Sequence, residues 1–272
     1  FMPGVYHAPF PDVYRFNGSA DACAAASLSF IRDQILVHLA SPDEIAAIVV
    51  EPIQGEGGYV VPPKAFLQGL RDLASEHGML LVVDEVQSGM GRTGKMFAAE
   101  HFDLKADIVN IAKGIASGLP LGVTCASAAI MSWPPGAHAS TFGGNPVSCA
   151  AANATIRLLK ESLVQNAATV GDHLIAGLRE VQRKHTLIGD VRGRGLMIGV
   201  ELVRSRDTKE RAVEERNALV QAMFRRGVLV LGAGRNALRL APPLVLTVDQ
   251  ANDVLRVFDE SLTEVSRSAA RP

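Results

Sequence analysis

Two short apolar runs, each followed by a polar side chain, constrain this 272-residue chain more than any other feature. Residues 79–83 form a continuous apolar run that ends in two valines, and Asp84 follows it. Further along, residues 107–112 repeat this pattern and stop at Lys113. Runs of this kind are typical of buried parallel strands. We therefore expect two parallel strands whose carboxyl ends hold Asp84 and Lys113 at one edge of an open α/β sheet, where such sheets bind ligands.

An aspartate and a lysine at neighbouring strand ends fit the chemistry of pyridoxal 5'-phosphate. A partly desolvated lysine loses its proton more readily and can then form a Schiff base with an aldehyde. A carboxylate can keep a proton on a heteroaromatic nitrogen, which turns the ring into an electron sink. A structural ion pair between Asp84 and Lys113 is the alternative interpretation.

The remaining pattern predicts an α/β chain with two domains. In the first part we expect helices over residues 20–39, which Ser19 caps, and 62–77, with further strands over 45–50 and 121–126. In the second part we expect helices over 147–159, 163–184 and 210–226, strands over 191–194, 196–203, 228–231 and 237–240, and a last helix that begins at the capping box Thr247-x-x-Gln250. The expected boundary separates a mainly parallel large domain, residues 1–160, from a smaller α+β domain, residues 161–272.

Five motifs follow one another along the chain: EPIQGEGG at 51–58, VVDEVQSGMGRTG at 82–94, NIAKGIASGLPLG at 110–122, STFGGNP at 140–146 and LRLAPPL at 238–244. Together they resemble class III pyridoxal-phosphate-dependent aminotransferases, the group of 4-aminobutyrate, ornithine and acetylornithine aminotransferases. The resemblance implies the fold of pyridoxal-phosphate-dependent transferases, with an incomplete large domain and a C-terminal small domain.

The resemblance also implies roles for five residues around the cofactor. Lys113 forms the Schiff base and moves the proton between substrate and cofactor, while Asp84 pairs with the ring nitrogen. Val86 packs on one ring face, and Gln87 hydrogen-bonds the ring hydroxyl. Thr141 reaches the cofactor phosphate of a neighbouring subunit, which implies a homodimer with the active site at its interface. Each of the last three has a structural alternative: Val86 as a core residue, Gln87 as a solvated loop residue and Thr141 as an ordinary turn residue.

Three further residues match substrate-binding positions of the family. An arginine fork suits a planar carboxylate, and Arg239 matches this arginine. Glu56 matches the glutamate that neutralises it when an amine without an α-carboxylate is bound, and Glu51 matches an acidic residue of the active-site floor. The pair implies a ping-pong transfer from an ω-amino acid or amine donor, similar to 4-aminobutyrate, to 2-oxoglutarate. A surface arginine on an edge strand is the alternative for Arg239.

Other activities of the same fold stay open at this point. They are acetylornithine or ornithine aminotransfer, an aminomutase, and a truncated remnant that acts as an interaction protein. The family's N-terminal portion, with a phosphate-binding loop and a stacking aromatic, lies upstream of the motif YHAPFP at 6–11. We therefore expect a fragment or a naturally short member with an exposed sheet edge and poor activity by itself.

Composition and spacing argue against several other classes. A net charge of -1 gives no reason to expect nucleic-acid binding, and no apolar run is long enough to cross a membrane. The three cysteines lack C-x-x-C spacing, which predicts free thiols in a reducing cytoplasm and no metal site. Residues 89–95 spell G-x-x-x-x-G-K, but Met96 stands where a nucleotide-binding loop needs Ser or Thr, so we expect no nucleotide site.

Overall fold

The computed structural model describes residues 3–269, which group into two compact units. The first unit comprises Phe1–Pro52, Pro62–Gln87 and Ala98–Asn153, and the second comprises Ile53–Val61, Ser88–Phe97 and Ala154–Pro272. The division falls inside helix α3 (Pro146–Leu158), and two loops from the first half of the chain belong to the second unit. The boundary near residue 160 stays a prediction.

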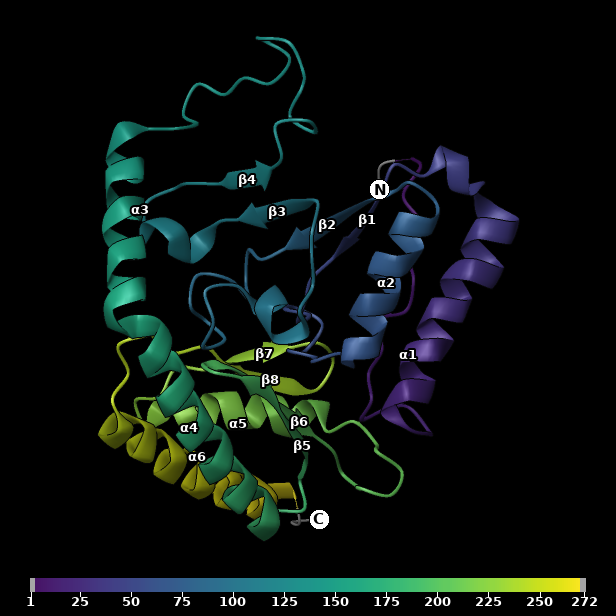
Figure 1. Ribbon diagram of the computed structural model, residues 1–272. Helices are drawn as coiled ribbons and strands as arrows, with labels where there is room; N and C mark the ends of the chain where they lie inside the picture. Colours follow the sequence, from purple (N-terminus) through teal and green to yellow (C-terminus); the bar gives the residue numbers. More distant parts are fainter. Residues whose placement is uncertain (1–2, 270–272) are drawn as a thin grey trace. The chain divides into compact units, whose positions relative to one another are not determined.

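A four-stranded sheet forms the centre of the first unit (Figure 1). Its strands lie in chain order: β1 (Ala47–Val50), β2 (Leu80–Asp84), β3 (Ile108–Ile111) and β4 (Val123–Ala126). The first three strands are parallel, which confirms the predicted parallel sheet. β4 runs antiparallel to β3, because only the short helix η4 (Lys113–Ala116) and a turn connect the two strands and no crossover helix intervenes.

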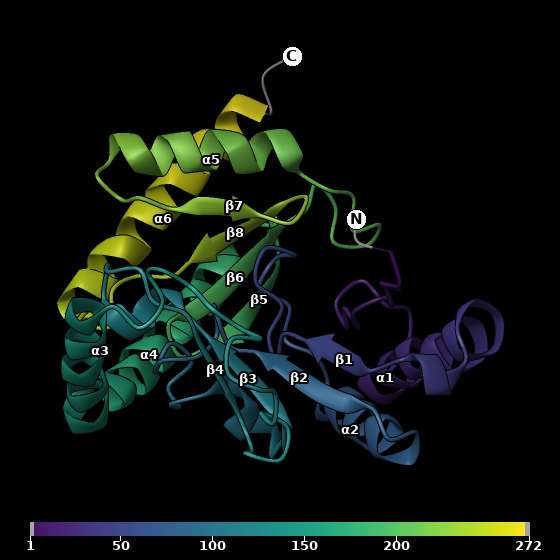
Figure 2. The same ribbon diagram turned by 90° about the horizontal axis from the view of Figure 1, so that it is seen from above.

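Two helical segments accompany this sheet. Helix α1 (Ala20–Ser29) begins at Ser19, whose Oγ accepts a hydrogen bond from the Ala22 N–H at 3.1 Å, as predicted. The segment continues as π-helical turns in η1 (Phe30–Leu39). Helix α2 (Lys64–Glu76) contacts β1 and β2 and lies beside α1 in both views (Figures 1 and 2). Its buried side chains recur at helical spacing: Phe66, Leu67, Leu70, Leu73 and Ala74.

Strand β1 is an edge of the sheet within the described residues. Its Val49 side chain is 67% exposed, although valine is apolar. An apolar groove of about 640 Å³ lies beside it, lined by residues 4–10, by η1 and by β1 itself. The expected exposed edge is therefore present in the structure.

The second unit contains an antiparallel sheet covered by helices. Its strands lie in the order β5 (Ile188–Arg194), β6 (Met197–Leu202), β8 (Ala237–Leu240) and β7 (Leu231–Ala233). The strand predicted at 228–231 was wrong in its position, because Val228 and Val230 pack into the core without a strand partner and pairing begins only at Leu231.

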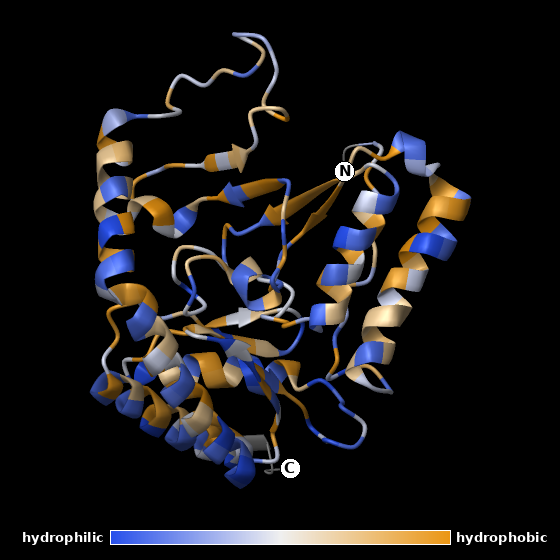
Figure 3. Cartoon of the chain, viewed as in Figure 1, coloured by the Kyte–Doolittle hydropathy of each residue, from blue (hydrophilic) through white to orange (hydrophobic). Residues whose placement is uncertain are grey.

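Three helices build the core of the second unit with this sheet: α4 (Val164–Lys184), α5 (Val213–Arg225) and α6 (Val248–Ala269). The π-helical turns of η5 (Leu159–Leu163) join α3 to α4, so the two helices predicted there form one continuous helical stretch. The capping box at the start of α6 is confirmed by reciprocal hydrogen bonds between Thr247 and Gln250, at 3.0 and 3.2 Å. Figure 3 shows apolar strands and two-faced helices, the pattern that buries one stripe of each helix.

Candidate active site

Asp84 and Lys113 lie at the carboxyl ends of neighbouring parallel strands, as predicted. Asp84 ends β2 and pairs with Asn110 of β3, and Lys113 comes two residues after the end of β3. Glu51 follows the end of β1 in the same way. The three side chains therefore share one edge of the sheet, the edge where open α/β sheets bind ligands.

Only one carboxylate oxygen of Asp84 is hydrogen-bonded within the described residues. Its Oδ1 accepts a hydrogen bond from the Val86 N–H at 2.9 Å, which fixes the turn after β2. Within residues 3–269 its Oδ2 has no hydrogen-bond partner, and no ion pair joins Asp84 to Lys113. The structural ion pair considered above is thus not formed, and a half-buried acceptor is available for a ring N–H.

Lys113 has an unusual backbone conformation. Its φ of 48° lies in the left-handed region, which is costly for a residue with a β-carbon, and such strain is concentrated at functional sites. The expected partial desolvation of its amine is not found, because Lys113, the first residue of η4, is exposed.

The other residues assigned to the cofactor differ in their placement. Val86 and Gln87 are half-buried in the turn that follows Asp84, so the sequence and the fold bring these three together. Thr141 is exposed in the segment between β4 and α3, where Ser140 Oγ accepts a hydrogen bond from the Gly143 N–H at 3.0 Å. This segment extends away from the sheet (Figure 1).

Glu85 was not singled out for a role of its own, although it is the most buried carboxylate of this region. It is 1% exposed, and its Oε1 accepts a hydrogen bond from the Ala99 N–H at 2.7 Å. Ala99 belongs to η3 (Ala98–Phe102), so Glu85 fixes this short helix to the turn after β2. Only its position next to Asp84 hinted at this in the sequence.

Glu56 and Arg239 form an ion pair in the second unit. Arg239 lies on β8, between Gly199 of β6 and Leu231 of β7, so it is not on an edge strand and that alternative is excluded. Its side chain is 19% exposed and that of Glu56 is 70% exposed. A sheltered guanidinium is therefore neutralised by a carboxylate that remains open to solvent.

Tyr59 interacts with Arg239 of this ion pair, and no motif in the sequence marks it. Its side chain is 4% exposed and is hydrogen-bonded to Arg239, and its φ of 54° is again left-handed. Burial raises the pKa of Tyr59, against the opposing effect of the positive charges of Arg239 and Arg92. The phenol therefore stays neutral and holds Arg239 through a hydrogen bond.

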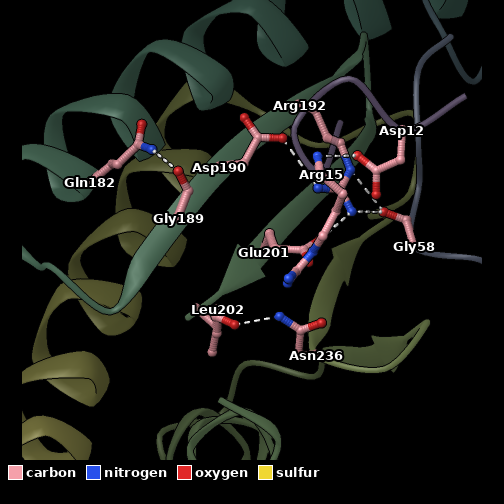
Figure 4. Close-up of polar contacts among 10 residues, drawn as sticks. All are labelled: Asp12, Arg15, Gly58, Gln182, Gly189, Asp190, Arg192, Glu201, Leu202 and Asn236. Carbon is pink, nitrogen blue, oxygen red and sulfur yellow. Dashed lines mark hydrogen bonds and ion pairs between the residues drawn. The ribbon is translucent and has the colours of Figure 1, made fainter. Parts of the chain in front are cut away.

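A buried ionic cluster holds the loop that carries Glu56 (Figure 4). Arg192 Nε and Nη2 donate to the Gly58 carbonyl at 3.1 and 2.7 Å. The same guanidinium pairs with Glu201 at 2.7 Å and with Asp190 at 3.1 Å. Burial opposes the charge of Arg192, but Glu201 and Asp190 outweigh it and raise the pKa of the guanidinium. Neither Arg192 nor Glu201 belonged to the predicted site.

Residues 3–269 offer neither a metal-binding cluster nor a helix that could span a membrane. No group of three His, Cys, Asp or Glu side chains there is arranged to hold a metal ion. None of the helices between residues 3 and 269 combines the length and the apolar character that crossing a membrane requires.

Comparison with known proteins shows the family. Residues 1–262 match the family described as Aminotransferase class-III, and the chain belongs to this family. It is 40% identical to the leucine/methionine racemase of Thermococcus litoralis, and the match covers 97% of this chain and 60% of that protein. It is 38% identical to the alanine/serine racemase of Pyrococcus horikoshii, where the match covers 97% of this chain and 57% of that protein. The chain thus spans about 60% of the length of the curated relatives it matches.

Solved structures agree with this assignment. An amine transaminase from an uncultivated Pseudomonas species, in its PLP-bound form, superposes with a TM-score of 0.90 at 32% identity, over 97% of this chain and 62% of the other. The predicted transferase fold with an incomplete large domain is thereby confirmed, and family membership indicates pyridoxal 5'-phosphate as the cofactor. The open acceptor of Asp84 and the strained, exposed Lys113 fit that group.

Proposed function

We propose that this chain carries the lysine and carboxylate-binding parts of a pyridoxal-phosphate-dependent aminotransferase. The observation that carries the proposal is the ion pair of Glu56 with the sheltered Arg239. An arginine that a movable carboxylate neutralises can accept a substrate carboxylate in one half-reaction and an uncharged group in the other. We therefore assign an ω-amino acid or amine donor similar to 4-aminobutyrate, and 2-oxoglutarate as the acceptor.

The residues at the strand ends supply the chemistry of amino transfer in this proposal. When bound, the cofactor supplies an electron sink that stabilises negative charge on the substrate carbon. Lys113 would hold the cofactor covalently, and its Nζ, once free, would carry the proton to and from that carbon. Asp84 would accept the ring N–H, Val86 would pack on the ring, Gln87 would bind the ring hydroxyl, and Glu51 would lie at the floor of the site.

The proposed active form is a homodimer in which Thr141 binds the cofactor phosphate of the other subunit. Support comes from the surroundings of Thr141: Phe142 is 86% exposed and Trp133 is 50% exposed in the same segment. Exposed aromatic side chains of this size are common at protein interfaces. The three free thiols, one of them the exposed Cys125, suit a reducing cytoplasm.

Racemisation of amino acids is the second candidate function. It is supported by the names of the two curated relatives, which are 40% and 38% identical to this chain. A racemase removes the α-proton and returns one to the opposite face of the same carbon, so it needs a lysine, an acid partner and a carboxylate-binding arginine but no amino acceptor. Lys113, Asp84 and Arg239 could serve either reaction.

The test begins with attachment of the cofactor. Purified chain is mixed with pyridoxal phosphate, reduced with borohydride and digested, and the modified peptide is identified by mass spectrometry. We expect the label on Lys113 and none in the Lys113→Ala variant. Labelling of scattered surface lysines only, unchanged by Lys113→Ala, would contradict the proposal.

Products then separate the two candidate reactions. The loaded chain is incubated with 4-aminobutyrate and 2-oxoglutarate, and separately with L-leucine alone, and the products are resolved by chiral chromatography. Glutamate formation that depends on 2-oxoglutarate supports amino transfer, whereas D-leucine formed without any oxo acid supports racemisation. Arg239→Gln is expected to weaken whichever reaction occurs, since it removes the carboxylate partner.

A further inference from the structure

The backbone of Glu56 is fixed although its side chain is open to solvent. Its carbonyl oxygen accepts a hydrogen bond from the Gly234 N–H at 2.7 Å. Two residues further on, Arg192 holds the Gly58 carbonyl, and a bridge between Gln54 and Val60 closes the loop. The side chain of Glu56 is 70% exposed. Glu56 can therefore exchange partners by rotating its side chain, without movement of the loop.

A cavity of about 530 Å³ lies beside this side chain. Glu56 lines it together with Arg216, Asn217 and Gln221 of α5 and with the β7 end of the sheet at Gly232. The volume exceeds what a carboxylate and a few waters need. A rotated Glu56 side chain has room in it.

Arg216 is a half-buried cation without an acidic partner among the described residues. Its Nε donates to Asn217 Oδ1 at 2.8 Å, while Nη1 and Nη2 make long hydrogen bonds to the carbonyls of Ala237 and Arg235, at 3.2 and 3.4 Å. None of these acceptors is charged, so the guanidinium charge is not compensated locally. A carboxylate is the partner that such a group favours.

The position of Arg216 brings it within reach of Glu56. A β-carbon built on Gly232 would lie 2.1 Å from Arg216 Nη1, so the guanidinium rests against this residue. Gly234, two residues along, holds the backbone of Glu56. Two residues of extended chain span about 7 Å at most, a gap that a glutamate and an arginine side chain can close together.

We propose that Arg216 is the second partner of Glu56: when a substrate carboxylate binds Arg239, the Glu56 carboxylate turns into the cavity and pairs with Arg216. This inference rests on the proposed function. It adds to that function the residue, Arg216, that pairs with the Glu56 carboxylate after the substrate displaces it from Arg239. Only side-chain torsions and hydrogen bonds change in this step. Arg216 thus acts as a positioning residue that favours carboxylate binding without touching the substrate.

Calorimetric titration with glutarate tests this, because glutarate has two carboxylates but no amino or oxo group to react. We expect Arg216→Gln to weaken glutarate binding roughly 10-fold, which corresponds to about 1.4 kcal/mol. Arg216→Lys keeps the charge and is expected to bind nearly as well as the unaltered chain. Arg225→Gln is the matched control, since Arg225 ends the same helix but pairs with Glu264.

The Glu56→Gln background separates the proposal from its rivals. The Glu56→Gln variant has no carboxylate at position 56 for Arg216 to bind. Adding Arg216→Gln to it should therefore leave glutarate binding unchanged. An equal loss in both backgrounds would mean that Arg216 contacts glutarate directly and would overturn the proposal, as would no loss in either. Arg239→Gln should abolish binding. If it does not, or if the unaltered chain binds no glutarate, the proposed function itself fails.

Discussion

Arg192 holds the carbonyl oxygen of Gly58 with two hydrogen bonds, at 3.1 Å from Nε and 2.7 Å from Nη2. One buried side chain therefore fixes the loop whose other residues include Glu56 and Tyr59. The proposed exchange of partners by Glu56 would therefore depend on a structural cluster that does not contact the substrate.

Replacing Arg192 with Ala should lower the free energy of unfolding by about 3–5 kcal/mol, because it removes the cation that pairs with the buried Glu201 carboxylate and the donor that holds the Gly58 carbonyl. The side chain of Glu201 is 6% exposed and that of Arg192 is 10% exposed. Urea unfolding followed by circular dichroism measures the change. Arg256→Ala is the control: its ion pair with Glu260 is exposed, so its loss should cost at most about 1 kcal/mol. Equal effects of the two variants would contradict the assigned role of Arg192.

A second prediction concerns acid stability and Asp107. Burial alone raises the pKa of Asp107, but the hydrogen bond from the Leu81 N–H at 2.7 Å and the ion pair with Arg71 at 2.6 Å outweigh it and lower this pKa. The folded state then binds the proton less readily than the unfolded state. The stabilisation is therefore present above the unfolded pKa, about 3.9, and is lost as the pH falls through the folded value.

Asp107→Asn should remove this pH dependence. We expect the free energy of unfolding of the variant to decline less steeply below about pH 4 than that of the unaltered chain. Urea unfolding at a series of pH values measures both slopes. Parallel slopes would show that Asp107 titrates alike in the folded and unfolded states.

Local patterns predicted much of the fold. Apolar runs bounded by charges located β2 and β3, and caps at Ser19 and Thr247 marked helix starts, because strand burial and helix capping depend on neighbouring residues. The same logic failed at 228–231, where packing of Val228 and Val230 satisfies the apolar pattern without a strand. Tertiary packing, which a single sequence does not display, decided that segment.

The candidate site was only partly predictable. Asp84 and Lys113 follow strands, so the topology alone places them at one edge. Tyr59 and Arg192 act through contacts with residues far along the chain, Arg239 and Gly58, and no local spacing marks such pairs. The exposure of Lys113 was not predictable either, because a strand pattern does not specify how the chain continues after the strand ends.

A third prediction separates cofactor attachment from cofactor activation. In Asp84→Asn the lysine is unchanged, so borohydride should still fix pyridoxal phosphate on Lys113. Amino transfer or racemisation should nevertheless slow, because an amide does not keep the ring nitrogen protonated. We expect a loss of roughly 100-fold, the lower end of the range for a group that controls a proton in catalysis. Labelling and initial rates measured on the same preparation check this. A variant that labels normally and reacts at full rate would remove Asp84 from the proposed site.

The last prediction uses two glycines with similar backbone and different surroundings. Gly234 has a φ of 54° and Gly227 a φ of 82°, so alanine at either position pays the strain of a left-handed residue, about 1–2 kcal/mol. A β-carbon at Gly234 would lie 2.6 Å from the Gly57 carbonyl oxygen, whereas at Gly227 it would meet nothing within 4 Å.

Gly234→Ala should therefore destabilise the chain by about 1–3 kcal/mol more than Gly227→Ala, since backbone atoms must move apart to admit the methyl group. It should also displace the loop of Glu56, whose carbonyl is held by the Gly234 N–H, and so change glutarate binding. Gly227→Ala should leave that binding unaltered. Urea unfolding and calorimetry on the two variants measure both effects. If both variants lose equal stability and bind glutarate alike, the close approach of Gly234 to the loop has no energetic role.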